Sequence, residues 1–252
     1  MKKIIFFLFF LFSSSLSIIY SQNKLTSEVM VEYNMTLDLD NLTQYDAYLY
    51  FNSSNAYFIY KPVKGSNYSE EVQENDNETR INISDSSSIQ LSIDKINNRL
   101  METKQPALSG ETYVIEESIP KVQWTLLDET KKINKLICKK AITVFRGRKY
   151  EVWYCPDLPF NYGPWKLSGL PGLILEAADD MRQVVFNVKK IEMPYHIEMP
   201  SKLKENIKTI TVAEYLKIQD NAIKDFEARM KSQSDRDMKI EVTYKLNDIE
   251  KE

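Results

Sequence analysis

The sequence predicts a mainly β, α+β fold: a single curved antiparallel sheet, or an open barrel, with one helix of the C-terminal region packed on it. Two observations support this prediction. Short runs of β-branched and aromatic residues alternate with polar residues through most of the chain, which is the period of a half-buried strand. A helical period is convincing only near the C-terminus.

The first strands are aromatic-rich. SEVMVEYNMTLDL alternates, with Val29, Val31 and Tyr33 on one face of the strand. The next stretch, DAYLYFNSSNAYFIYKP, predicts a hairpin about the polar residues 52–55. Residues 65–77 are polar and acidic, and we expect a mobile loop there. Shorter strands are expected in SIQLSI, NRLMETK and ETYVIEES.

The second half contains the clearest hairpin, KLICKKAITVFRGRKYEVWYC, in which strand-forming residues flank Arg146-Gly147. Two more strands are expected in GLILEAADDMRQVVFNVKKIEM, on either side of Asp179-Asp180. Thr211 and Glu214 have the spacing of a capping box, and apolar residues then recur at helical spacing up to Met230. A last strand is expected in MKIEVTYKL.

The two cysteines, Cys138 and Cys155, suggest a disulfide in an exported chain. If Arg146-Gly147 is a two-residue hairpin loop, counting outward places the two cysteines opposite each other. They then occupy a non-hydrogen-bonded pair with Cα atoms about 4.5 Å apart, near the short limit of disulfide geometry. A bulged turn would instead point the thiols to opposite faces, and two free buried thiols are the remaining alternative.

The sequence offers little material for catalysis or metal binding. It has one histidine, His196, which we interpret as an ordinary loop residue, and no phosphate-binding or nucleophile-elbow motif. We therefore expect no catalytic residue, no metal and no cofactor. The formal net charge of −3 and the lack of a basic, aromatic-rich run argue against nucleic acid as a partner.

Three of the six glycines fall in GPWKLSGLPGLILEAADD. Leu170-Pro171-Gly172-Leu173 fits a type II turn, which requires positive φ at Gly172. The run that follows, LIL, is expected to be a strand buried on both faces. This corner is interpreted as an architectural turn. The alternative is a weak ligand or partner site, whose residues would be Trp165, Gly169, Leu170, Pro171 and Gly172.

Residues 1–21 have the pattern of a cleaved signal peptide: two lysines, a short apolar run and a small residue before the cut. An uncleaved membrane anchor is the alternative interpretation. We expect residues 22–252 to form a single β-rich domain without a transmembrane segment after cleavage. The protein is expected to be exported, to the periplasm, the outer membrane or the exterior.

The hexapeptide at 169–174 reads GLPGLI, and the segment around it resembles the GLPGLI family of exported Bacteroidota proteins. Further residues of the resemblance are Trp124, Cys138-Lys139-Lys140-Ala141, Gly147-Arg148, Trp153-Tyr154, Leu158-Pro159, Gly163-Pro164 and Leu175-Glu176. The resemblance implies an envelope location and a β-rich fold, and it implies no reaction.

The leading functional hypothesis is a non-enzymatic envelope protein that binds an apolar or peptide-like ligand or an outer-membrane protein partner. A hydrolase without a recognisable motif and a purely structural component of an envelope complex are the alternatives. A curled sheet can leave an apolar concave face. Five aromatic residues are candidates for lining it, although core positions are the alternative: Tyr48, Tyr50, Tyr57, Phe58 and Tyr60.

Overall fold

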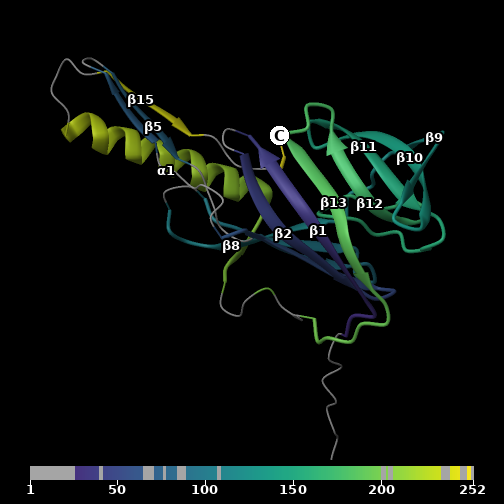
Figure 1. Cartoon of the computed structure of the whole chain (residues 1–252). Helices are drawn as coiled ribbons and strands as arrows, with labels where there is room; N and C mark the ends of the chain where they lie inside the picture. Colours follow the sequence, from purple (N-terminus) through teal and green to yellow (C-terminus); the bar gives the residue numbers. More distant parts are fainter. Residues whose placement is uncertain are drawn as a thin grey trace, which may run out of the picture.

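The structure is a computed structural model that describes residues 26–39, 42–64, 71–75, 78–83, 89–106, 109–199, 203, 207–233, 239–244 and 249–250. For 71–75, 78–83 and 239–244 it describes the backbone alone. These residues form an open, curved sheet of twelve strands, a separate sheet of three strands and one helix (Figure 1). The predicted fold class is therefore confirmed. The predicted signal peptide, 1–21, lies outside the described residues.

The large sheet has the strand order β14-β8-β7-β6-β3-β2-β1-β13-β12-β11-β10-β9. Its first half comprises β1 (Val29–Asp38), β2 (Leu42–Phe51), β3 (Asn55–Pro62), β6 (Ile89–Asp94), β7 (Arg99–Lys104) and β8 (Tyr113–Ser118). Its second half comprises β9 (Thr125–Ile133), β10 (Leu136–Phe145), β11 (Arg148–Cys155), β12 (Leu173–Asp179) and β13 (Val184–Glu192), and β14 (Thr209–Ile210) lies at the far edge. The two halves join where β1 pairs with β13.

Most pairs in the large sheet are antiparallel, as expected from the many short hairpins, but β14 pairs with β8 in parallel. The small sheet comprises β4 (Glu71–Asn75), β5 (Glu78–Ile83) and β15 (Lys239–Tyr244), and β15 runs parallel to β5. The last predicted strand therefore joins the small sheet. Within the segment expected to be a mobile loop, 65–77, the structure describes strand β4, and the rest lies outside the described residues.

Helix α1 (Val212–Gln233) begins where the capping box predicts. The Thr211 hydroxyl accepts a hydrogen bond from the Glu214 backbone N–H at 3.2 Å, and the Glu214 carboxylate accepts one from the Thr211 N–H at 2.7 Å. The helix contacts β8 of the large sheet and β15 of the small one (Figure 1). Among the described residues, no helix is long and apolar enough to cross a membrane.

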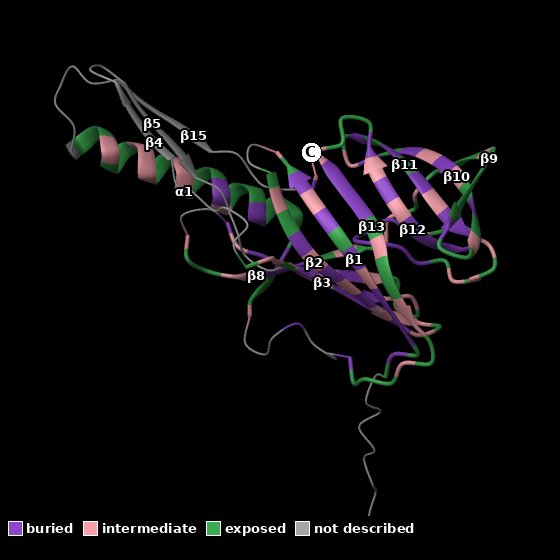
Figure 2. Cartoon of the chain, viewed as in Figure 1, coloured by how far each residue is buried: buried purple, intermediate pink, exposed green. Residues whose placement is uncertain are grey.

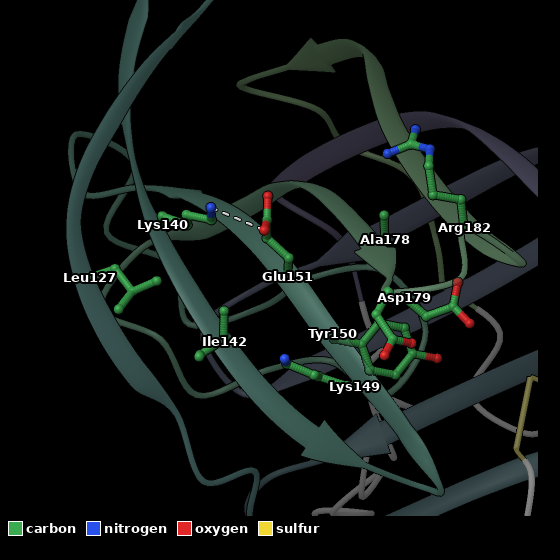
Figure 3. A pocket seen from close by; sticks show the side chains of 10 residues that line it. Leu127, Lys140, Ile142, Lys149, Tyr150, Glu151, Ala178, Asp179 and Arg182 are labelled. Carbon is green, nitrogen blue, oxygen red and sulfur yellow. Dashed lines mark ion pairs between the residues drawn. The ribbon is translucent and has the colours of Figure 1, made fainter.

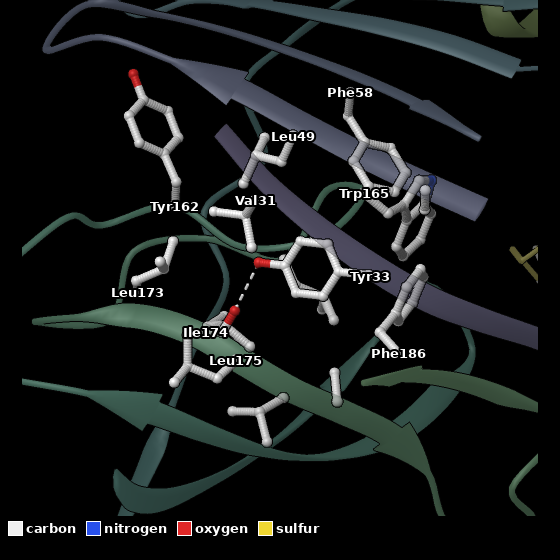
Figure 4. Close-up of a cluster of buried hydrophobic side chains, with 14 of the residues drawn as sticks. Val31, Tyr33, Leu49, Phe58, Tyr162, Trp165, Leu173, Ile174, Leu175 and Phe186 are labelled. Carbon is white, nitrogen blue, oxygen red and sulfur yellow. Dashed lines mark hydrogen bonds between the residues drawn. The ribbon is translucent and has the colours of Figure 1, made fainter. Parts of the chain in front are cut away.

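The core lies on the inner face of the large sheet. Along β1, buried residues alternate with more exposed ones, as its colours show in Figure 2, and β2 has the same alternation. Val31 and Tyr33 are fully buried, so the face that they share in the first strand is the one that covers the core. The Tyr33 hydroxyl donates a 2.8 Å hydrogen bond to the Ile174 carbonyl, which links β1 to β12 across the core (Figure 4).

The segment between β11 and β12, residues 156–172, covers the inner face. Its large apolar side chains belong to the same core cluster: Phe160, Tyr162, Trp165, Leu167 and Leu170. Phe51 contacts Phe160 and Tyr162, with ring centroids 5.1 Å and 4.8 Å apart. Since this segment fills the concave side, the concave face is a packed core, and the exposed surface of the strands is the opposite, outer face.

Candidate functional site

The outer face of β9–β12 has a hollow of about 330 Å³ near the β10–β11 and β12–β13 hairpins (Figure 3). Its apolar floor consists of Leu127, Ile142 and Ala178. Around the floor lie charged residues and one tyrosine: Lys140, Lys149, Tyr150, Glu151, Asp179, Asp180 and Arg182. The hollow thus combines a small apolar surface with many charged and hydrogen-bonding groups, which favours a polar ligand over an apolar one.

One wall of this hollow is held by a lysine between two carboxylates. Lys140 Nζ lies 2.8 Å from Glu129 Oε2 and 3.0 Å from Glu151 Oε2. Hydrogen bonds to Glu129 and Glu151 raise the pKa of Lys140, so it stays charged. On the other side, Lys149 and Arg182 have no ion-pair partner among the described residues. These two cations are therefore available to a ligand.

Trp153 lies next to the hollow on the same outer face, two residues beyond Glu151 on β11. The ammonium groups of Lys131 and Lys140 lie 5.6 Å and 5.7 Å from the centroid of its ring, within cation–π range. Lys131 also forms an ion pair with Glu176 of β12. The half-buried indole ring thus lies on the outer face between charged neighbours that fix its position.

A second cluster of charges is buried between strands β7 and β8, the β10–β11 turn and the segment 156–172. Lys166 Nζ lies 2.9 Å from Glu102 Oε2, 2.8 Å from Glu117 Oε1 and 2.5 Å from Glu250 Oε1. Its side chain is 3% exposed, so these contacts are desolvated. Arg146 pairs with Glu117, and Lys104 lies 3.7 Å from Glu102.

This buried cluster, formed by Lys104, Arg146, Lys166 and the three glutamates, has equal numbers of positive and negative groups. Burial alone raises the pKa of Glu102, but Lys104 and Lys166 outweigh this effect and lower it. A general acid near neutral pH needs the opposite shift, a raised pKa. The arrangement therefore fits a structural role, in which Glu250 is tied to strands β7 and β8 through Lys166.

A buried pair in the same region also contacts the last described residues. Arg148 Nη1 lies 2.7 Å from Asp179 Oδ2, and Arg148 Nε donates a hydrogen bond to the Ile249 carbonyl at 2.6 Å. Both side chains are almost fully buried, so Asp179 contributes to the edge of the hollow while its carboxylate is already satisfied. The Asp179-Asp180 turn predicted from the sequence is present between β12 and β13.

The five residues predicted as a weak ligand site are not all on the surface. Trp165 is 1% exposed and lies edge-on to Phe145, at 5.7 Å between ring centroids, and Leu170 is also buried. Gly169, with φ of 95°, and Pro171 are exposed. The predicted core strand that follows is confirmed, because its three residues, Leu173, Ile174 and Leu175, are fully buried.

Gly172 is required for a reason other than the predicted one. Its φ is not in the positive region, so the predicted type II turn is wrong at this position. A Cβ atom on Gly172 would lie 2.3 Å from the carbonyl oxygen of Cys155 and 2.9 Å from the Pro156 nitrogen. Glycine is therefore needed because two backbone segments approach each other closely. Gly163 is similar: a Cβ there would lie 2.6 Å from the Leu167 carbonyl oxygen.

The predicted disulfide is wrong, since Cys138 and Cys155 are both free and both buried. The register expected from the Arg146-Gly147 loop is correct, because Phe145 pairs with Arg148. However, the β10–β11 ladder ends at Lys139 and Tyr154, one step before the cysteines, and Cys155 pairs with Leu173 of β12. Burial and the neighbouring Cys155 raise the pKa of the Cys138 thiol to about 12.

The aromatic residues proposed for a concave face are divided between two surfaces. Phe58 and Tyr60 belong to the inner core. Tyr48, Tyr50 and Tyr57 alternate with inward residues and lie on the outer face, where Tyr48 and Tyr50 are stacked with ring centroids 6.3 Å apart.

Among the described residues, no group of three or more His, Cys, Asp or Glu side chains is placed to hold a metal ion.

Comparison with known proteins gives a family match. The family model described as the N-glycanase peptide N-terminal domain, of the PNGase F-II type, matches residues 65–220, more than half of the chain. No curated protein matches. The GLPGLI assignment is wrong, because the matching family is a different one. The hexapeptide behind that assignment is explained by packing: Gly172 approaches Cys155, and Leu173 and Ile174 enter the core.

Two solved structures of PNGF-II, in the C2 and P21 space groups, share the fold with TM-scores of 0.51 and 0.50. Each is 17% identical in sequence, and the match covers 78% of this chain and 33% of that protein. The chain thus spans about a third of the length of these proteins. A structure of an uncharacterized conserved protein from Thermus thermophilus matches 73% of the chain and 91% of its own, with 8% identity and a TM-score of 0.37.

Sequence reasoning missed the hollow and the residues around it. Lys140 and Trp153 were noted only within a family pattern, and Lys139-Lys140 would ordinarily be read as solvated strand positions. The available signal is alternation: Lys140, Ile142, Glu151 and Trp153 all occupy outward positions of one hairpin. What the alternation does not show is that β9 and β12 flank this hairpin and close the hollow.

Proposed function

The chain belongs to the family of the N-glycanase peptide N-terminal domain, and from this premise we propose that it recognises glycan chains of glycoproteins without cleaving them. The hollow beside Trp153 is the binding site in this proposal. The observation that carries it is the combination of an apolar floor, an indole ring and hydrogen-bonding charges on one exposed face. Sugars have both apolar C–H faces and hydroxyl groups, so such a face matches both parts of their surface.

Non-enzymatic binding is favoured over hydrolysis by the state of the carboxylates. The buried carboxylates that lie together, Glu102, Glu117 and Glu250, all contact Lys166. At the hollow, Glu151 is paired with Lys140 and Asp179 with Arg148. Hydrolysis of a glycan linkage needs a carboxyl group that can contact the linkage as acid, base or nucleophile, whereas these carboxylates are engaged in ion pairs with the protein's own cations.

Export remains part of this proposal. It rests on the signal-like pattern of residues 1–21 and on the chemistry of the ligand, because glycosylated asparagines lie on the surface of secreted proteins. An exported chain would meet such glycans outside the cytoplasm. The same location suits a protein that works beside an enzyme acting on glycoproteins.

The test is isothermal titration calorimetry, in which a high-mannose N-glycan is titrated into the purified protein and the dissociation constant is measured. Ile142→Trp fills the floor of the hollow and should abolish binding. Val144→Trp is the matched control, because Val144 is exposed two residues farther along the same strand and does not line the hollow. Unchanged binding by the Ile142→Trp protein, or no binding by the parent, would reject the proposal.

A further inference from the structure

A row of side chains on the outer face crosses the junction between the two halves of the sheet. Each residue of the row is the pairing partner of the next across neighbouring strands. In the order β11, β12, β13, β1 and β2, the residues are Trp153, Glu176, Asn187, Asn34 and Asp46. We call this set the outer row. It begins at Trp153, beside the hollow, crosses β12, which borders the hollow, and continues over β13, β1 and β2, which take no part in it.

The outer row points away from the core. Where each strand crosses the row, its successive side chains point to opposite faces of the sheet. Asn34, for example, is exposed between the buried residues Tyr33 and Met35. Asn187 is also exposed, and it directly faces Asn34 across the β1–β13 pair. Neither side-chain amide has a hydrogen-bond partner among the described residues. Each amide offers both donors and acceptors, the groups that match a hydroxyl-rich ligand.

Aromatic rings lie at both ends of the outer row. Trp153 is the first member, and Tyr48 follows the last member, Asp46, two residues farther along β2 on the same face. Tyr48 stacks on Tyr50, with an angle of 15° between the rings, so it is held in place by its neighbour. Four strand spacings separate β11 from β2, which corresponds to about 19 Å at about 4.8 Å each.

The charges along the outer row are balanced. Glu176 is paired with Lys131, and Asp46 lies 4.0 Å from Lys189, which also contacts Glu32 at 2.6 Å. These pairs carry no net charge, and the asparagine amides between them are uncharged, so the row is nearly neutral. The outer row therefore has no net charge to attract a strongly charged partner. An uncharged chain with hydroxyl and amide groups can instead form hydrogen bonds with it.

We propose that the outer row binds an extended, uncharged oligosaccharide chain that runs from the hollow beside Trp153 across β12, β13 and β1 to Tyr48. The inference rests on the proposed glycan recognition, and it adds the path that the glycan follows across the sheet and the length of surface that it covers. The hollow holds one end of the chain, the two asparagines hydrogen-bond its middle, and Tyr48 contacts its far end.

The test compares ligands of different length by calorimetry: the dimer of N-acetylglucosamine and a high-mannose N-glycan that contains this dimer. Asn34→Ala and Asn187→Ala should each weaken binding of the N-glycan about two- to tenfold, the value of one hydrogen bond, and leave the affinity for the dimer unchanged. Asn221→Ala is the matched control, an exposed asparagine on α1 that is remote in sequence and sheet order. It should change neither affinity.

Two results overturn the inference in distinguishable ways. If Asn34→Ala and Asn187→Ala bind the N-glycan like the parent while Ile142→Trp does not bind, the hollow is the whole site and the outer row has no role. If the parent binds neither sugar, the outer row and the proposed function both fail. Thermal melts of the alanine variants should match the parent, because both side chains are exposed and neither amide has a hydrogen bond to a described residue.

Discussion

The α-carbon of Gly172 faces the carbonyl oxygen of Cys155 so closely that an added Cβ would lie 2.3 Å from that oxygen. The close approach joins the beginning of β12 to the end of β11, where Cys155 pairs with Leu173. We expect Gly172→Val to destabilise the protein by about 1–3 kcal/mol, because the neighbouring atom belongs to backbone and has little room to move. Chemical denaturation measures this change.

Pro171→Ala is the matched control for that variant, since Pro171 adjoins Gly172 but is exposed. Its midpoint of denaturation should stay close to that of the parent. A Gly172→Val protein as stable as the parent would mean that the two segments can separate without cost, and the packing explanation of the GLPGLI hexapeptide would be wrong.

Lys166→Met should destabilise the protein by about 3–5 kcal/mol, the usual cost of breaking a buried pair from one side. The substitution leaves Glu102, Glu117 and Glu250 without their shared partner. Equilibrium denaturation at neutral pH measures the loss. Lys224→Met is the control, because Lys224 forms an exposed pair with Asp220 on α1 and contributes little.

The Lys166→Met defect should also depend on pH. In the parent, the lysines lower the folded-state pKa of Glu102 despite burial, so their contribution is present above the ordinary carboxyl range and is lost as the pH falls through the folded-state pKa. In the variant, Lys104 and Arg146 alone oppose burial, so the folded-state pKa of Glu102 should be higher than in the parent, and less stability should be lost as the pH falls. The difference between the two proteins should shrink from about pH 7 to about pH 4. A constant difference would contradict this explanation.

Both thiols should be unreactive in the folded protein and free in the unfolded one. Burial, together with the nearby Cys155, raises the pKa of Cys138 to about 12, and neither thiol is exposed. Labelling with a maleimide near neutral pH should therefore give no adduct on the native protein and two per chain in denaturant without reductant. Fewer than two labels in denaturant would indicate that the cysteines are linked.

The local parts of the fold were predictable because their determinants are close in sequence. The Arg146-Gly147 turn requires two residues with positive φ, and both have it, at 49° and 71°. The Thr211 and Glu214 capping box likewise marks the first turn of α1. The alternation in β1 correctly placed Val31 and Tyr33 on one face of the strand, and the structure shows that this face is buried.

The long-range parts were not predictable from one sequence. The partners of Lys166 come from β7, β8 and the last described residues, and no local pattern connects them. The outer row depends on the pairing of β1 with β13, two strands separated by most of the chain. The role of Gly172 was misassigned because a turn and a close backbone approach both favour glycine.

Fluorescence of Trp153 during a titration with a high-mannose N-glycan is the most direct test of glycan recognition at the outer face. Trp153 is half-buried beside the hollow, whereas Trp165 is in the core and the indole of Trp124 donates a hydrogen bond to the Ser168 carbonyl. We expect a saturable emission change in the parent and in Trp124→Phe that disappears in Trp153→Phe. No change in the parent, or the same change in Trp153→Phe, would contradict the proposal.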